Sequence, residues 1–280
     1  MRRVFLVAKN LRCRLLLVEF PKQMAPVEVA AKMVDMNHVE IVLANNDRLT
    51  LRVGDTFLKI DADQTRTDVE VEAIAMAPVP TPQILWRTPP VLALAALPGR
   101  ALGRSREPSA ASSAAWAAAG AAIRTLHDAP LPPWPGTTVD QLASRLAHEC
   151  DWLVANDVLP HQVVARNRQL ASAAIRTWEP VFIHGDLHSE HVFVEGDKVT
   201  GILDWSEARQ GDALYDLATL TLASEEHLDD VIAGYGVDVD RDLIRAWWSW
   251  RSLVVVRWLF ENGYGSPDEF PEVAVLRSQA

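Results

Sequence analysis

The sequence contains few cysteines and no long apolar run. Only Cys13 and Cys150 occur among its 280 residues, and Cys150 stands between two acidic residues, where a reactive thiolate is disfavoured. This usage fits a reducing compartment, so we expect a cytoplasmic protein. Even the apolar stretch LVVVRWLF is interrupted by Arg257, and nothing approaches the length of a bilayer-spanning helix.

The N-terminal segment lacks the features of an export signal. Basic and apolar residues occur together in residues 1–20, but Lys9, Arg12 and Arg14 interrupt the apolar stretch and no small-residue cleavage site follows. Residues 1–35 are therefore interpreted as an N-terminal extension whose status the sequence leaves open.

Basic residues are too few for a nucleic-acid partner. The chain has 27 Lys and Arg against 37 Asp and Glu, a formal net charge of -10, whereas a polyanion requires a basic face. From residue 181 onward there are 19 acidic residues against 7 basic ones. We expect this acidic C-terminal part to suit a cationic small molecule.

The hydrophobic pattern changes character near residues 94–99. The first part predicts mostly strands, and the second part predicts helices. The expected strands cover residues 38–43, 48–53, 56–60, 78–86 and 91–99, with a helix over 65–77. The expected helices cover residues 110–127 with Ser109 as cap, 138–156, 162–178, a stretch from 212, and 241–260. The prediction is an α+β chain with a small antiparallel lobe over 36–97 and a larger helical lobe over 98–280.

The segment FIHGDLHSEH, residues 182–191, concentrates titratable groups in a short loop. A predicted strand enters it and a predicted hairpin, with its turn at residues 195–198, leaves it. Folding the hairpin back brings Asp204 near Asp186, with His191 beside them. Two such carboxylates predict a site for a hard cation, and one of them could accept a proton.

Several motifs together resemble the aminoglycoside phosphotransferase-like kinases. HGDLHSEH followed by ILDW is similar to the catalytic loop and metal-binding motif of that family. FLKI, EAIAM, LALAALPG and LHDAP occur in the same order as in the family, so the resemblance spans residues of roughly 38–262. It implies the two-lobed protein-kinase-like fold and a kinase that uses ATP and Mg²⁺.

The resemblance also implies roles for individual residues. Asp186 corresponds to the catalytic Asp, Asp204 to the Asp that holds Mg²⁺, and Lys59 to the lysine on the nucleotide phosphates. Glu72 corresponds to the helix partner of Lys59, and the backbone of Ala95 and Leu97 to the contacts with the adenine edge.

Two further aspartates follow the hairpin. By the same resemblance, Asp212 is expected to brace the catalytic loop through its backbone, and Asp216 to support the following helix.

Two positions depart from the usual family pattern. His191 stands where most members have Asn, and macrolide phosphotransferases are similar to this chain in having His there. Mg²⁺ prefers oxygen ligands to imidazole. Residues 44–48, ANNDR, contain no glycine where kinases have a glycine-rich turn. Asn45 and Asn46 tolerate a positive φ and could replace it.

The leading hypothesis is a phosphotransferase that moves the γ-phosphate of ATP to a hydroxyl group of a small, cationic acceptor. An aminoglycoside or a macrolide is the expected acceptor, which would make the protein an antibiotic-resistance enzyme. Charge alone suggests acceptor contacts at Glu207, Glu261, Asp268 and Glu269. The alternatives are a metal-dependent hydrolase, which would use His184, Asp186, His188, His191 and Asp204, and a nucleotide-binding pseudokinase.

Overall fold

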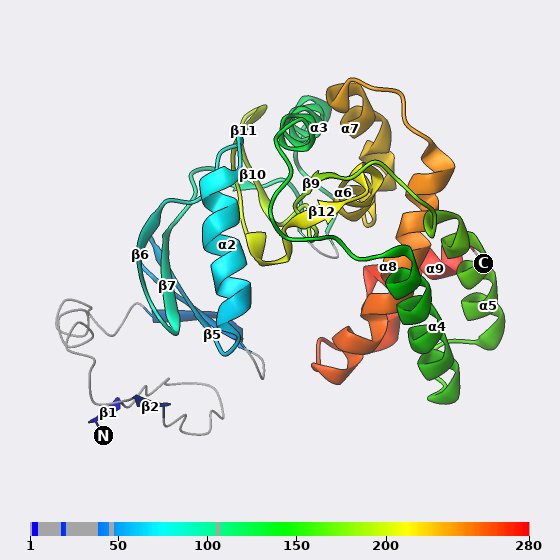
Figure 1. Cartoon of the computed structure of the whole chain (residues 1–280), viewed down its shortest axis with the longest axis horizontal. Coiled ribbons are helices and arrows are strands. Elements are labelled where there is room, and N and C mark those ends of the chain that lie inside the picture. The colour runs from blue at the N-terminus through cyan, green and yellow to red at the C-terminus, as the bar shows by residue number, and fades with distance from the viewer. Residues whose placement is uncertain (1, 5–17, 21–38, 45–47, 105–106, 280) are drawn as a thin grey trace.

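The computed structural model describes residues 2–4, 18–20, 39–44, 48–104 and 107–279. Most of the expected extension over 1–35, and Asn45 and Asn46, therefore lie outside the described residues. Within the described part, two short strands, β1 (Arg2–Val4) and β2 (Val18–Phe20), pair antiparallel. Figure 1 shows a sheet with one helix on one side of the molecule and a helical region on the other.

The small lobe is built on a five-stranded antiparallel sheet with the order β3-β4-β5-β7-β6. Its strands are β3 (Val39–Ala44), β4 (Arg48–Val53), β5 (Thr56–Asp61), β6 (Ile84–Thr88) and β7 (Val91–Ala95). The tight turn between β4 and β5 has Gly54 at φ 59°, a left-handed conformation that favours glycine. The meander expected from the turn residues and β-branched strands is therefore present.

Helix α2 (Gln64–Met76) follows β5 and lies alongside the sheet (Figure 1). Asp63 caps it by accepting from the backbone N–H of Thr65. Its buried side chains are Thr67, Glu70 and Ala73, which recur every three residues and so share one face. A charged residue, Glu70, therefore points inward beside apolar ones.

Two small sheets carry the loop that contains Asp186. Strand β10 pairs with both β11 and β8, and β9 pairs with β12. Their bounds are β8 (Arg100–Ala101), β9 (Val181–Ile183), β10 (Val192–Glu195), β11 (Lys198–Ile202) and β12 (Arg209–Gly211). The hairpin predicted after the loop is β10 and β11, with its turn at residues 195–198 as expected.

The remaining helices form the large lobe around a core rich in tryptophan. They are α3 (Ser113–His127), α4 (Val139–Ala155), α5 (His161–Ala171), α6 (Ala213–Thr221), α7 (Leu228–Tyr235), α8 (Arg241–Glu261) and α9 (Pro271–Ser278). The described residues also contain four short 3-10 turns: η2 (Ser172–Ala174) after α5, η3 (Trp205–Glu207) between β11 and β12, η4 (Glu225–His227) before α7 and η5 (Pro267–Glu269) before α9. Helix α8 is the central one, because most of its length from Ile244 to Val256 is buried.

Two helix boundaries differ from the sequence prediction. Helix α3 is capped by Ser112, whose side chain accepts from the N–H of Ala115, whereas Ser109 donates to the carbonyl of Leu102. The predicted helix over 162–178 ends at Ala171 and tightens into η2. The predicted helix over 138–156 is present as α4, and Thr138 caps it with a full capping box.

The small and large lobes give the α+β architecture that the sequence predicted. In the part of the chain that the structure describes, no helix is both long and apolar enough to cross a membrane. The division of the chain at residues 97 and 98 stays a prediction.

Candidate active site

Lys59 lies on β5 and makes two ion pairs, one within the small lobe and one with the large lobe. Its Nζ donates to both carboxylate oxygens of Glu70 at 2.6 and 2.7 Å and to Oδ1 of Asp204 at 2.9 Å. The predicted partner Glu72 is wrong, because Glu72 is exposed and lies two residues further along α2, off the buried face. Glu70 is the residue that the helix turns toward β5.

The charges around Lys59 and Asp204 hold both groups ionised. Burial alone would lower the pKa of Lys59, but the charges of Asp204 and Glu70 outweigh it and raise that pKa. Burial would raise the pKa of Asp204, but Lys59, His191 and Arg48 hold it well below its usual range. Burial raises the pKa of Glu70, although the charge of Lys59 opposes this shift. The short contacts of both its oxygens favour a charged pair.

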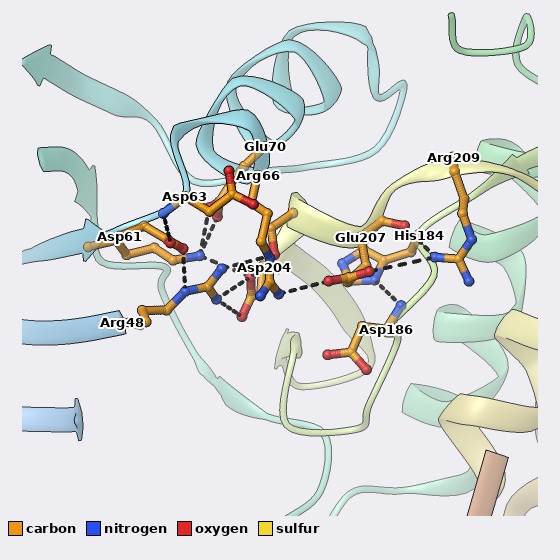
Figure 2. Close-up of polar contacts among 12 residues, drawn as sticks. Arg48, Asp61, Asp63, Arg66, Glu70, His184, Asp186, Asp204, Glu207 and Arg209 are labelled. Carbon is orange, nitrogen blue, oxygen red and sulfur yellow. Dashed lines mark hydrogen bonds and ion pairs between the residues drawn. The ribbon is translucent and has the colours of Figure 1, made fainter. Parts of the chain in front are cut away.

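Asp204 follows β11 and sits between the two lobes (Figure 2). Its backbone is left-handed, with φ 59° and ψ 66°, at the entry to η3. Arg48, the first residue of β4, donates from Nη1 to Asp204 at 3.2 and 3.3 Å. Ser206 donates to Oδ1 of Asp204 at 3.1 Å. The carboxylate is thus held by groups from both lobes.

The loop after β9 is held by a buried aspartate of α6. Asp216 accepts from the backbone N–H groups of His184 and Gly185 at 2.7 and 2.9 Å. Asp212 instead caps α6 and accepts from Arg176 and Trp247. The predicted roles of the two aspartates were therefore wrong, since one turn of α6 carries Asp216 beneath the loop and leaves Asp212 at its start.

Three further contacts shape this loop. Gly185 has φ 82°, and a Cβ there would lie 2.2 Å from the carbonyl oxygen of Glu207, so only glycine fits. The buried His184 donates from Nε2 to the carbonyl of Leu203 at 2.8 Å, which ties the loop to the end of β11. His191 closes the loop by donating from Nδ1 to the carbonyl of Asp186 at 2.8 Å.

The side chain of Asp186 contacts an arginine of α8. Nη2 of Arg251 donates to Oδ1 of Asp186 at 2.5 Å and to Nε2 of His188 at 2.6 Å, and its Nη1 donates to the hydroxyl of Tyr215 at 3.0 Å. Arginine can only donate, so Nε2 of His188 accepts from it and is no donor to Asp186, although the two lie 3.2 Å apart. Burial would raise the pKa of Asp186, but the adjacent guanidinium of Arg251 holds it well below its usual range.

Comparison with known proteins identifies the family. The model of the phosphotransferase enzyme family matches residues 44–253. The chain belongs to this family. The matched range contains Lys59, Asp186 and Asp204, so the resemblance expected from the motifs is confirmed.

Solved structures share the fold of this phosphotransferase at low sequence identity. A choline/ethanolamine kinase family protein from Mesorhizobium loti is 20% identical, with a TM-score of 0.65 over 91% of this chain and 95% of that one. A macrolide 2'-phosphotransferase from Brachybacterium faecium is 19% identical, with a TM-score of 0.61 over 89% and 96%. The GDP complex of aminoglycoside 2'-phosphotransferase-IIIa is 16% identical, with a TM-score of 0.67 over 86% and 91%. The predicted two-lobed, protein-kinase-like fold is confirmed.

The carboxylates of the phosphotransferase fit a magnesium ion better than a transition metal. Among the described residues, no three His, Cys, Asp or Glu side chains form a group that could hold a metal ion. The cluster imagined for a metallohydrolase is therefore not assembled. Mg²⁺ is usually bound by one or two carboxylates together with substrate phosphates and water, which an ionised and partly exposed Asp204 can provide.

The connection between the lobes contains the two residues expected at the adenine edge. The N–H of Ala95 donates to the carbonyl of Gln83 at 2.9 Å and is therefore engaged within the small lobe. The side chain of Leu97 packs against Gly201 of β11, where a Cβ would lie 2.3 Å from it.

The connection is fastened on both sides of Leu97. The N–H of Ala96 donates to the carbonyl of Asp55 at 2.8 Å, and the carbonyl of Pro98 accepts from Thr200 at 2.6 Å. Gly99 then has φ 88° and passes so close to Val194 that a Cβ would lie 2.3 Å from its carbonyl oxygen.

Three residues at the centre of the site were missed by sequence reasoning. Glu70 could have been predicted to face inward, because it lies three residues before the apolar Ala73 and residues three apart share a helix face. Arg251 is a charged residue within an otherwise apolar part of α8, which signals a buried partner. Arg48 stands directly opposite Asp61 in the β4–β5 pairing, and that register follows from the tight turn between the strands.

Proposed function

We propose that this phosphotransferase moves the γ-phosphate of ATP, in the presence of Mg²⁺, to a hydroxyl group of an aminoglycoside or macrolide. The observation that carries the proposal is the position of Lys59 between Glu70 and Asp204. Phosphoryl transfer needs positioning and neutralisation of charge, for which a buried lysine and an ionised aspartate at the same point are suited.

Lys59 binds the α and β phosphates of the nucleotide, and Glu70 keeps its ammonium group in place. The carbonyl of Ala95 and the backbone of Leu97 meet the adenine edge. Three of the solved structures are described as GDP complexes, so the choice between ATP and GTP belongs to the test.

Asp204 would hold the magnesium ion. His191 lies beside Asp204 and is a second candidate ligand. When bound, the metal neutralises charge on the phosphates. His191 also keeps the backbone of Asp186 in place through its Nδ1. Because imidazole is a poor ligand for Mg²⁺, this bond is the main contribution that we assign to His191.

Asp186 orients the acceptor hydroxyl and receives its proton, so that the hydroxyl oxygen attacks the γ-phosphorus directly while its bond to the β–γ bridging oxygen breaks and ADP leaves. Arg251 contacts Oδ1, and we assign Oδ2 to the hydroxyl. No phosphorylated form of the enzyme is required. A pseudokinase, by contrast, would bind nucleotide without transfer.

The acceptor is a small molecule, and the acidic large lobe favours a cationic one. The contacts first suggested by charge are already engaged. Glu207 pairs with Arg66, Glu261 with Arg257 and Asp268 with Arg277, while Glu269 caps η5. The relatives' names indicate acceptors such as macrolides and kanamycin. Modification of such a compound would give antibiotic resistance. Neither nucleic acid nor a membrane is proposed as a partner.

The test is a nucleotide-consumption assay with ATP and GTP, with and without Mg²⁺, across aminoglycosides, macrolides and other hydroxylated amines. Acceptor-stimulated turnover that is lost in Asp186→Ala supports the proposal. Nucleotide binding without turnover for any acceptor would favour the pseudokinase. Tightly bound zinc or iron in the purified protein would favour the hydrolase.

A further inference from the structure

Arg48 occupies a central position in the site that no motif assigns. Its Nε donates to Oδ2 of Asp61 at 2.8 Å, its Nη1 contacts Asp204, and its Nη2 donates to Ser206 at 3.2 Å. Figure 2 shows Arg48 reaching from the strand toward Asp204, with Asp61 beside it. The guanidinium is therefore directed at the same carboxylate as the ammonium of Lys59.

The two cations are held in equivalent ways. Each is paired with a buried acid of the small lobe, Glu70 for Lys59 and Asp61 for Arg48, and these side chains are only 2% and 6% exposed. Each also makes one ion pair with Asp204, whose side chain is 27% exposed. The buried acids fix the two cations, and Asp204 is the contact that a ligand could share or replace.

Nucleotide binding changes the partners of this pair. If Asp204 turns away from an incoming polyphosphate, or toward a metal, the guanidinium of Arg48 keeps its pair with Asp61 but its Nη1 loses an acceptor in a region with little water. A buried donor without an acceptor is costly. The polyphosphate of the nucleotide is the anion that can replace Asp204, and the forked donors of arginine match phosphate oxygens.

We propose that Arg48 is a second phosphate-binding cation, which contacts the nucleoside triphosphate beside Lys59. This inference rests on the nucleotide-binding part of the proposed function. Residues 44–47 contain no glycine, and a glycine-rich turn commonly binds phosphates through its backbone N–H groups. In this chain the side chain at the start of β4 supplies part of that contact.

The test measures the binding of ATP and of adenosine by calorimetry, both in EDTA and with Mg²⁺. For Arg48→Gln we expect the affinity for ATP in EDTA to fall roughly 10- to 100-fold, the loss of a charge-assisted contact, while the affinity for adenosine is unchanged. Arg52→Gln is the matched control, because Arg52 lies on the same strand, is 47% exposed and contacts Gly54 and Phe57. It should bind both ligands as the unaltered protein does.

The alternative is that Arg48 only steadies Asp204. Arg48→Gln would then weaken ATP binding with Mg²⁺ and leave binding in EDTA unchanged, which overturns the inference. If Arg48→Gln also loses adenosine binding, Arg48→Lys is the second test variant. Its affinity for ATP in EDTA is divided by its affinity for adenosine, and this ratio is compared with that of the unaltered protein. A ratio lowered at least about threefold supports the inference, and an unchanged ratio refutes it. If the unaltered protein binds neither ligand, the proposed function falls as well.

Discussion

Asp216 offers the most direct test of how the catalytic loop is held. Its carboxylate is fully buried and accepts from the N–H groups of His184 and Gly185, and it lies 3.2 Å from Nε2 of His127. The change Asp216→Ala removes the acceptor and leaves these donors without a partner in the core. A water molecule can take the place of the lost carboxylate only where the remaining space is large enough to hold it.

The expected loss follows from the two backbone donors. An unsatisfied buried polar group costs about 1–3 kcal/mol, so two of them cost about 2–6 kcal/mol. For a chain of this size each kcal/mol lowers Tm by about 2–4 °C. We expect Asp216→Ala to lower Tm by roughly 5–20 °C, and Asp216→Asn by less, because its amide keeps one accepting oxygen.

The loss should depend on pH in one direction. Burial would raise the pKa of Asp216, but its bond with His127 and the backbone N–H of Gly185 lower it. A group whose folded-state pKa is lowered stabilises fully above its unfolded pKa of about 4 and loses that contribution as the pH falls. The difference between the unaltered protein and Asp216→Ala should therefore be largest near neutral pH and shrink below about pH 4.

Thermal and denaturant unfolding at several pH values provide the measurement. Asp229→Ala is the control, because Asp229 is 78% exposed on α7 and should change stability by less than about 0.5 kcal/mol. A Tm for Asp216→Ala within about 2 °C of the unaltered protein would show that the loop does not depend on these bonds.

Three further predictions concern the other central contacts. Glu70→Gln should raise the KM for nucleotide and lower the free energy of unfolding by about 3–5 kcal/mol. Glu72→Gln should change neither quantity. Equal effects of the two substitutions would refute the pairing of Glu70 with Lys59. Arg251→Met should lower kcat about 10- to 100-fold with little change in nucleotide KM, because Asp186 loses its strongest orienting contact; steady-state kinetics with an unchanged kcat would contradict this. Gly99→Ala should lower Tm measurably, since its Cβ would meet a carbonyl oxygen; an unaltered melting curve would show that the backbone adapts.

The architecture was predictable because local signals agree with the tertiary structure. Turn glycines, β-branched strands and the Thr138 cap each specify a boundary without help from distant residues. The order of the motifs pointed to Lys59, Asp186 and Asp204, which all lie within the matched family range.

The partners of these residues were harder to predict than the residues themselves. Glu70 and Glu72 have the same chemistry, and only the rotation of α2 against the sheet decides which one meets Lys59. Asp212 and Asp216 differ in the same way, by one helical turn. Arg251 meets Asp186 across 65 positions of sequence, so packing of α8 rather than any local pattern creates that pair.

The fastening on either side of Leu97 has a consequence for how the enzyme could open. Ala96 is bonded to the β4–β5 turn and Pro98 to β11, so the covalent link has about one residue left as a pivot. A swing about so short a joint moves the tips of the lobes far more than their base. The lobes would then part most at the far rim, while the end beside the connection stays nearly constant in width.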